Sequence, residues 1–298
     1  DVSGPVGVNL PWPTVATLKS GAIQLAWLNA GSASMVTRRI SAAGAFGDPI
    51  ALPGLLSLPP SPWPAVVAFA ETEAIVLRVE GGESPAAQRV VYNILSDVAL
   101  EPQLLGLDSH TDELIMSVDA VSRSDGGVWV IWTAVDASAA RSLRLQAVLP
   151  SGAPADNVLT VATGTSVNRA VLATQTDGTV VAAWDEDGGI MARPVAPLGA
   201  LSMVHPADTT GNSEPSLVAS GVGYLVVWQG PDESDTGIFS RPLGADAAPN
   251  GAMVQLNTTT DGSQAGARAA VIGDERIVVV WRDSIGQNAR VTARVLTP

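Results

Sequence analysis

Short apolar runs rich in valine and isoleucine alternate along the whole chain with turns that contain Gly, Asp, Asn or Pro. The runs are about four to seven residues long, which is typical of β-strands, and no stretch has the period of an amphipathic helix. One run, Gly223–Trp228, ends in tryptophan and recurs with variations. Its copies are Ala22–Trp27, Val128–Trp132, Thr179–Trp184, Arg276–Trp281 and a weaker one, Ala74–Leu77, which has leucine in place of tryptophan.

The copies follow one another at about 50 residues, and each repeat has room for four strands. A period of this length without helices indicates a β-propeller. Around Trp228 we expect strands at 215–220, 223–229, 237–243 and 252–257. First strands are also predicted at 13–18, 64–69, 115–121, 169–174 and 267–272, and third strands at 34–40, 88–95, 141–148, 189–195 and 289–296.

The last repeat ends after three strands, whereas the chain begins with a spare one, Val6–Leu10. Circular closure removes exposed sheet edges, so we expect this N-terminal strand to complete the last blade. The predicted fold is therefore all-β: one domain over residues 1–298, a six-bladed β-propeller of four-stranded antiparallel blades closed by the N-terminal strand.

One segment carries a resemblance to known repeats. Residues 255–264 lead into Val278–Trp281, and this pattern resembles the VVVW-type repeats of large exported bacterial proteins. The resemblance is clearest in the last three repeats and weakest in the second, which lacks the tryptophan. It implies a propeller-like fold and carries no activity with it.

Charge and composition exclude several partners. The net charge is −13 and the pI is near 4.4, so nucleic acid is excluded and anionic membrane surfaces are disfavoured. No apolar run reaches the length of a membrane span, so membrane insertion is not expected. Cysteine is absent, which excludes disulfides and thiol chemistry. The composition and the start at Asp1 favour a secreted, periplasmic or cell-surface bacterial protein.

Two residue types recur at fixed positions. The repeat tryptophans are expected to lie between neighbouring sheets, because a bulky residue at one register in every blade suits that place. Four third strands carry an arginine in one register, for which we expect a surface charge or an ion pair between blades. These arginines are Arg38, Arg193, Arg241 and Arg294.

Catalytic motifs are scarce. Two histidines support neither a histidine-dependent triad nor a multi-histidine metal site. The Asp-box of sialidases is absent, and Tyr92 and Tyr224, the two candidates for a tyrosine nucleophile, lie in predicted strands. Two acidic loops, 185–188 and 232–235, could offer oxygen ligands to calcium, although solvated turns are favoured. No catalytic residue, metal or cofactor is assigned.

The candidate ligand face comes from topology. In a propeller, the loops before each first strand and those between second and third strands surround the central channel. Trp12 and Trp63 precede first strands of adjacent blades, and their rings would suit a sugar or an apolar side chain. The predicted ligand-binding residues are Trp12, Trp63, His110, Asp112, Glu113, Asn168, Arg169, Glu214, Gln264 and Arg268.

These observations favour an exported, non-catalytic recognition or scaffold module that binds a glycan or a protein at the central funnel. A carboxylate-based glycoside hydrolase or lyase is the first alternative, and a pair of carboxylates across the funnel would favour it. A structural subunit of a surface assembly is the second alternative, and a flat apolar patch on a blade edge would favour it.

Overall fold

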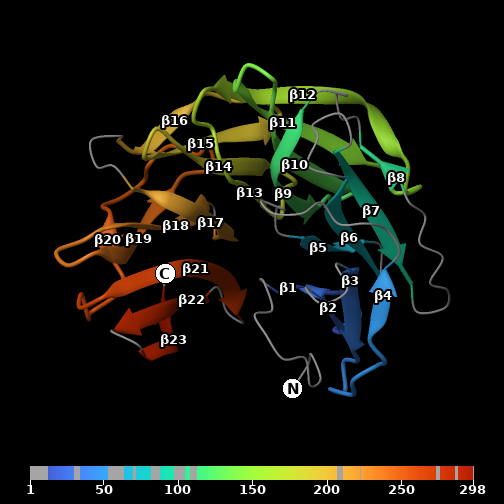
Figure 1. The fold of residues 1–298 in the computed structure, drawn as a ribbon, viewed down its shortest axis with the longest axis horizontal. Coiled ribbons are helices and arrows are strands. Elements are labelled where there is room, and N and C mark those ends of the chain that lie inside the picture. The colour runs from blue at the N-terminus through green and yellow to red at the C-terminus, as the bar shows by residue number, and fades with distance from the viewer. Residues whose placement is uncertain are drawn as a thin grey trace. The chain divides into compact units, whose positions relative to one another are not determined.

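The computed structural model describes residues 13–29, 34–52, 64–69, 72–81, 88–96, 105–107, 113–206, 211–221, 223–272, 276–285 and 288–297. All regular secondary structure in these ranges is β-strand, which confirms the all-β prediction (Figure 1). Within them, no helix is long and apolar enough to cross a membrane. The chain divides into two compact units, residues 1–163 and 164–298, and the single domain over residues 1–298 stays a prediction.

Unit 1 contains three four-stranded antiparallel sheets, each built from strands that follow one another in sequence. The first sheet has β1 (Thr14–Thr17), β2 (Ile23–Asn29), β3 (Ser34–Ile40) and β4 (Ile50–Leu52). The second has β5 (Ala65–Phe69), β6 (Glu73–Glu80), β7 (Arg89–Leu95) and β8 (Leu105–Gly106). The third has β9 (Leu114–Ser122), β10 (Val128–Val135), β11 (Arg141–Val148) and β12 (Pro154–Gly164).

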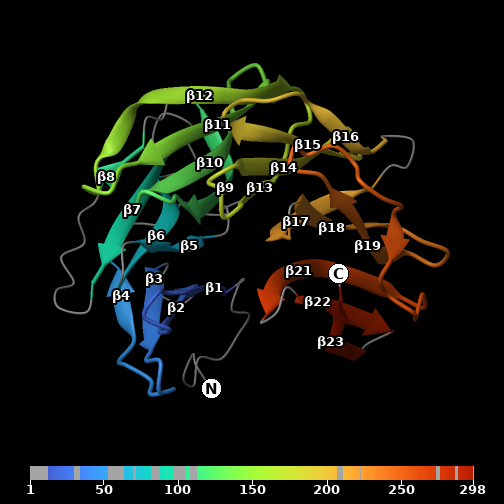
Figure 2. The ribbon, with the colours of Figure 1, turned by 180° about the vertical axis from the view of Figure 1, so that it is seen from behind.

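Unit 2 repeats the same meander (Figure 2). Its first sheet has β13 (Ala170–Thr174), β14 (Val180–Glu186), β15 (Gly189–Ala196) and β16 (Ser202–His205). The next has β17 (Ser213–Ser220), β18 (Gly223–Pro231), β19 (Thr236–Leu243) and β20 (Val254–Gln255). The last strands are β21 (Ser263–Ile272), β22 (Arg276–Ile285) and β23 (Asn288–Leu296), and one parallel pair, Thr236 with Ser263, links them to β19.

The predicted first and third strands agree with these bounds to within a few residues, and two third strands, 34–40 and 141–148, agree at both ends. The fourth strands were harder to place. The strand expected at 252–257 is only Val254–Gln255, because an edge strand has hydrogen bonds on one side alone. The expected closing strand, Val6–Leu10, lies outside the described residues.

The five repeat tryptophans are at most 5% exposed, as predicted. Trp132 belongs to a core cluster that includes Leu77 of the preceding sheet. Trp228 likewise shares a core with Ala183, and Trp281 with Val227. Each of these three tryptophans therefore joins its own sheet to the sheet before it.

The recurring arginines, for which a surface charge or an ion pair between blades was expected, donate from their guanidinium groups to backbone carbonyl oxygens. Arg193 and Arg241 donate from Nε to Gly199 (3.1 Å) and Gly251 (3.0 Å) in the turns that follow their own strands. Arg241 also donates to Val204 in the preceding sheet, at 2.7 Å. The planar guanidinium can hold a turn and a neighbouring sheet together because it offers several donors in fixed directions.

Candidate functional site

The residue that directly follows each repeat tryptophan lies opposite the start of the first strand of its sheet. Side chains alternate along a strand, so this residue points away from the face that holds the tryptophan. In two sheets it forms a polar side-chain pair: Thr133 with Ser117 at 2.9 Å, and Gln229 with Ser213 at 3.1 Å. In the sheet β13–β16 the same place is occupied by a carboxylate, Asp185.

Asp185 is only 7% exposed. Asn168 holds it with two hydrogen bonds: its backbone N–H donates to the Asp185 carbonyl at 3.0 Å, and its Nδ2 donates to Oδ2 at 2.9 Å. The other carboxylate oxygen, Oδ1, is buried and has no hydrogen-bond partner among the described residues. Burial raises the pKa of Asp185 to about 6, and the negative charge of Glu214 adds to the shift, while Asn168 and Arg169 oppose it.

Glu214 approaches from the next sheet, at the start of β17. The pairing of β17 with β18 shifts between Ser213 and Ser216, so that Glu214 lies in a β-bulge. Its φ of 51° is left-handed, a conformation that glycine adopts without strain and other residues seldom adopt. Bulges redirect side chains and often lie next to active sites, and a strained residue there suggests a functional constraint.

Arg169 lies between the two carboxylates. Its Nη1 is 3.8 Å from Oε2 of Glu214, and its positive charge acts on Asp185 as well. Oε2 of Glu214 is buried, and no described residue forms a hydrogen bond with it. We call Asn168, Arg169, Asp185 and Glu214 the carboxylate site. It holds two acidic groups and one guanidinium, with one buried, unbonded oxygen on each carboxylate.

The prediction from sequence named three of these four residues. Asn168, Arg169 and Glu214 all precede or begin a first strand, and the structure brings them together. Asp185 was missed as a site residue because the letters Asp-Glu-Asp-Gly were interpreted as a turn. Only residues 187 and 188 form that turn, and both have positive φ, of 53° and 76°. The signal that would have found Asp185 is its position directly after the repeat tryptophan.

Other predicted site residues have different surroundings. Glu113, in unit 1, forms an ion pair with Arg144, with 2.6 Å between Oε2 and Nη1. Gln264 is fully buried and donates to the carbonyl of Asp261 and to Asp283. Arg268 donates to the carbonyl of Ala267 at 2.6 Å. Trp12, Trp63, His110 and Asp112 lie outside the described residues, so the aromatic platform stays a prediction.

The second acidic loop is organised by its first residue. Oδ1 of Asp232 accepts the backbone N–H groups of Ser234 and Asp235 at 3.0 and 3.1 Å, and its Oδ2 accepts from Gln255 and Asn257. Within the described ranges, no group of three or more His, Asp or Glu residues is arranged to hold a metal ion. Asp232 thus closes a turn and ties it to Gln255 of β20 and to Asn257.

Both tyrosines are buried, and the hydroxyl group of each forms a hydrogen bond. The Tyr92 hydroxyl donates to the carbonyl of Gly152 at 2.7 Å, and that of Tyr224 to Thr179 at 3.0 Å. Burial raises the pKa of both phenols above its ordinary value. A tyrosine nucleophile must be accessible and readily ionised, so neither residue suits that role.

Comparisons with known proteins place the fold. No family model and no curated protein matches the sequence. Among solved structures, a protein of unknown function from Dyadobacter fermentans is similar with a TM-score of 0.65 at 13% identity, covering 96% of this chain and 94% of its own. An α-L-arabinofuranosidase from Fusarium graminearum, solved with an iminosugar inhibitor, has a TM-score of 0.64 at 10% identity, with coverage of 96% and 92%.

A third similar structure is the Hadza microbial sialidase Hz136, with a TM-score of 0.60 at 14% identity. The match covers 90% of this chain but only 62% of the sialidase. At sequence identities this low, the similarity shows the fold and assigns no role to any residue. The three similarities together show a β-propeller-like all-β fold.

Proposed function

We propose that the carboxylate site hydrolyses glycosidic bonds. The observation that carries this proposal is the pairing of Asp185 and Glu214: two carboxylates from neighbouring sheets that interact electrostatically, each with a buried oxygen left unbonded among the described residues. Glycoside hydrolysis needs two such groups, one to protonate the leaving oxygen and one to act as nucleophile or base. Buried polar atoms are normally hydrogen-bonded, so a pair of unbonded carboxylate oxygens suits a substrate hydroxyl or a water.

The different surroundings of Asp185 and Glu214 suit them to different catalytic roles. Asp185 has a raised pKa of about 6 because it is buried, so it keeps a proton into the weakly acidic range and is the candidate general acid. Glu214 lies beside the guanidinium of Arg169, which stabilises a negative charge, so it is the candidate nucleophile or base. Asn168 is a positioning residue, because its two hydrogen bonds fix Asp185 in place.

The comparisons support this proposal more than a non-catalytic recognition module. The similar structures include an α-L-arabinofuranosidase and a sialidase, and a Penicillium chrysogenum α-L-arabinanase complexed with arabinobiose covers 99% of this chain at a TM-score of 0.60. A glycan is therefore the proposed ligand. Arabinose-containing oligosaccharides are the first substrates to test, and these similar structures give no support to a protein partner.

The test is hydrolysis of arabino-oligosaccharides and a wider glycan panel by the purified chain. We expect turnover by the wild type and a loss of about 10²–10⁴-fold in Asp185→Asn and in Glu214→Gln. Asp187→Asn is the matched control, because Asp187 lies in the adjacent turn and bonds to Ser166 outside the carboxylate site. If the wild type bound glycans without hydrolysing them, the non-catalytic recognition module would be favoured and the proposed hydrolase activity would be wrong.

We also propose the finer architecture and location. The chain forms six blades, and Val6–Leu10 adds the fourth strand beside β23. Supporting this, β23 is the last described strand of its sheet, and Val291 and Val295 are 80% and 52% exposed on it. An exposed apolar edge strand favours pairing with another strand. An exported or cell-surface location suits a protein that acts on glycans.

A further inference from the structure

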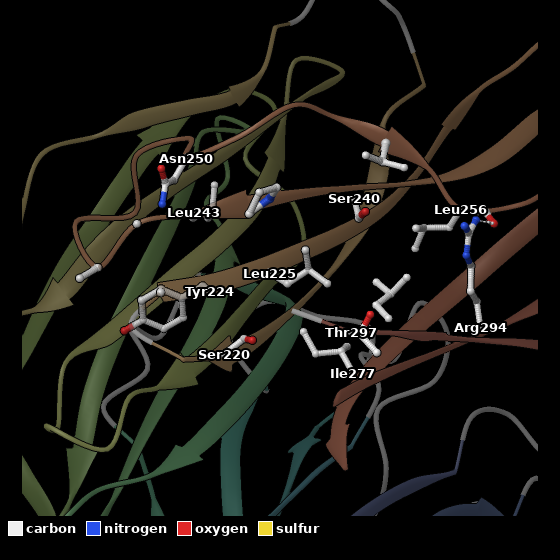
Figure 3. A pocket seen from close by; sticks show the side chains of 16 residues that line it. Ser220, Tyr224, Leu225, Ser240, Leu243, Asn250, Leu256, Ile277, Arg294 and Thr297 are labelled. Carbon is white, nitrogen blue, oxygen red and sulfur yellow. Dashed lines mark hydrogen bonds between the residues drawn. The ribbon is translucent and has the colours of Figure 1, made fainter. Parts of the chain in front are cut away.

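A cavity of about 780 Å³ lies in unit 2 between the sheet β17–β20 and the strands β21–β23 (Figure 3). Its walls are mostly apolar and include Leu225, Leu243, Leu256 and Ile277. Ser220, at the far end of β17 from Glu214, also lines it, and five residues of strand lie between the two, a separation of about 20 Å. The cavity is therefore separate from the carboxylate site, and its volume is in the range of small-molecule pockets.

The cavity lies where the neighbouring gap between sheets is filled by a large side chain. Tyr224 lies four residues before Trp228, and it fills the corresponding space between β13–β16 and β17–β20. It is 2% exposed, and its hydroxyl reaches Thr179 in the sheet before. The residue four before Trp281 is Ile277, which is aliphatic like Ile23, Val128 and Val180 at the same place in other repeats. The next gap between sheets therefore has no aromatic side chain at this position.

A second difference enlarges the same space. The turn between β13 and β14 comprises residues 175–179, and Gln175 in it donates to the carbonyl of Gly223 in the next sheet. Strand β17 ends at Ser220 and β18 begins at Gly223, and no described residue between them is a counterpart of Gln175. Among the described residues, no equivalent of the Gln175 hydrogen bond crosses the second gap.

One cation borders the cavity. Arg294 donates from Nη1 to the carbonyl of Leu256 at 2.7 Å. The equivalent arginines Arg193 and Arg241 also use Nε, on the turn after their own strand. Among the described residues, none accepts a hydrogen bond from Nε or Nη2 of Arg294. Figure 3 shows its side chain at the rim, beside Leu256.

We propose that this cavity is a second binding site, for a ligand with an apolar ring or chain and one anionic group. The apolar body takes the place that Tyr224 fills in the neighbouring gap. The carboxylate or sulfonate meets the guanidinium of Arg294, because charge-assisted bonds to arginine are among the stronger hydrogen bonds in proteins. The site is independent of glycan hydrolysis, and its ligand is a different class of molecule.

The probe is 1-anilinonaphthalene-8-sulfonate, which has aromatic rings and one sulfonate, and N-phenyl-1-naphthylamine is its neutral counterpart. Fluorescence titration of the full chain should show saturable binding of the sulfonate at one site. Ile277→Trp supplies the missing aromatic filler and should weaken the binding of both probes about tenfold or more. Arg294→Gln should weaken the sulfonate alone. Arg193→Gln, at the same register but away from the cavity, is the control and should change neither.

If Ile277→Trp does not fold, Leu296→Trp is a second variant that fills the same cavity. Thermal melting checks the fold of every variant. Wild-type sulfonate affinity in a folded filled variant would overturn the site, as would the absence of saturable binding. An equal loss of both probes in Arg294→Gln would overturn the anionic part of the proposal.

Discussion

Glu214 and Gly266 occupy the same place in two sheets of unit 2. Each lies in a two-residue bulge opposite a repeat tryptophan, Trp228 and Trp281 respectively, and each has a positive φ, of 51° and 68°. Glycine tolerates this conformation, whereas a left-handed glutamate costs about 1–3 kcal/mol. One sheet thus carries strain that its neighbour avoids, at the position that directs a carboxylate toward Asp185.

The strained backbone at Glu214 predicts that a glycine there would make the protein more stable but inactive. Glu214→Gly should raise the free energy of unfolding by about 1 kcal/mol, because it relieves the strained backbone, and should abolish hydrolysis. Urea denaturation and a hydrolysis assay measure the two effects. Gly266→Ala is the mirror control and should destabilise by a similar amount with activity retained. A destabilised Glu214→Gly would count against backbone strain at this bulge.

The pKa of Asp185 predicts how stability depends on pH. The folded pKa is about 6, above the ordinary 3.8, so between these values the folded state binds the proton more tightly than the unfolded state. The contribution of Asp185 to stability is therefore complete below about pH 4 and is lost as the pH rises through about 6. The loss is at most about 3 kcal/mol.

Asp185→Asn should remove this loss. Above pH 7 the variant is expected to be more stable than the wild type by about 1–3 kcal/mol, because a neutral amide replaces a buried charge. Denaturation in urea at pH values from 4.5 to 8 measures the difference, and Asp187→Asn should keep the wild-type slope. If the free energies of unfolding of the wild type and Asp185→Asn changed with pH in parallel, ionisation of Asp185 would carry no cost in stability.

The tryptophans differ in their polar atoms. Nε1 of Trp228 donates to Oδ1 of Asn212 at 3.1 Å, whereas Nε1 of Trp281 is buried with no partner among the described residues. Trp228→Phe should therefore cost about 1–2 kcal/mol more than Trp281→Phe, because it removes a buried hydrogen bond to Oδ1 of Asn212. Thermal and urea unfolding of the two variants, compared with each other, test this. Equal losses would mean that packing alone decides their contribution.

Regular features of the fold were predictable from the sequence, and the site was predictable in part. Alternation and the repeated tryptophan locate the strands, because both follow from burial of one face of every sheet. Asn168, Arg169 and Glu214 were found by their place before first strands. The bulge at Glu214 has no sequence signal, since glycine marks the same position in the next sheet. Asp185 was missed because the letters Asp-Glu-Asp-Gly are typical of a turn, although its position directly after the repeat tryptophan marks it as a strand residue.

Closure by the N-terminal strand makes its own prediction. Deleting residues 1–10 should leave the edge of β23 unpaired and promote association through Val291 and Val295. Size-exclusion chromatography and thermal melting of the shortened chain measure this. The double variant Val291→Lys, Val295→Lys should restore a monomer, because charged residues protect an edge strand. An unchanged melting temperature and monomer content after the deletion would count against closure.

In the proposed mechanism, Asp185 donates a proton to the leaving group and Glu214 acts as nucleophile or activates water, and one measurement separates these roles. Hydrolysis rates are compared between a 2,4-dinitrophenyl glycoside, whose leaving group needs no proton, and an oligosaccharide of the same sugar, whose leaving group does. Asp185→Ala should lose about 10²-fold or more on the oligosaccharide and little on the dinitrophenyl glycoside, whereas Glu214→Ala should lose activity on both. Wild-type rates in either variant, or equal losses on both substrates in Asp185→Ala, would contradict the assignment.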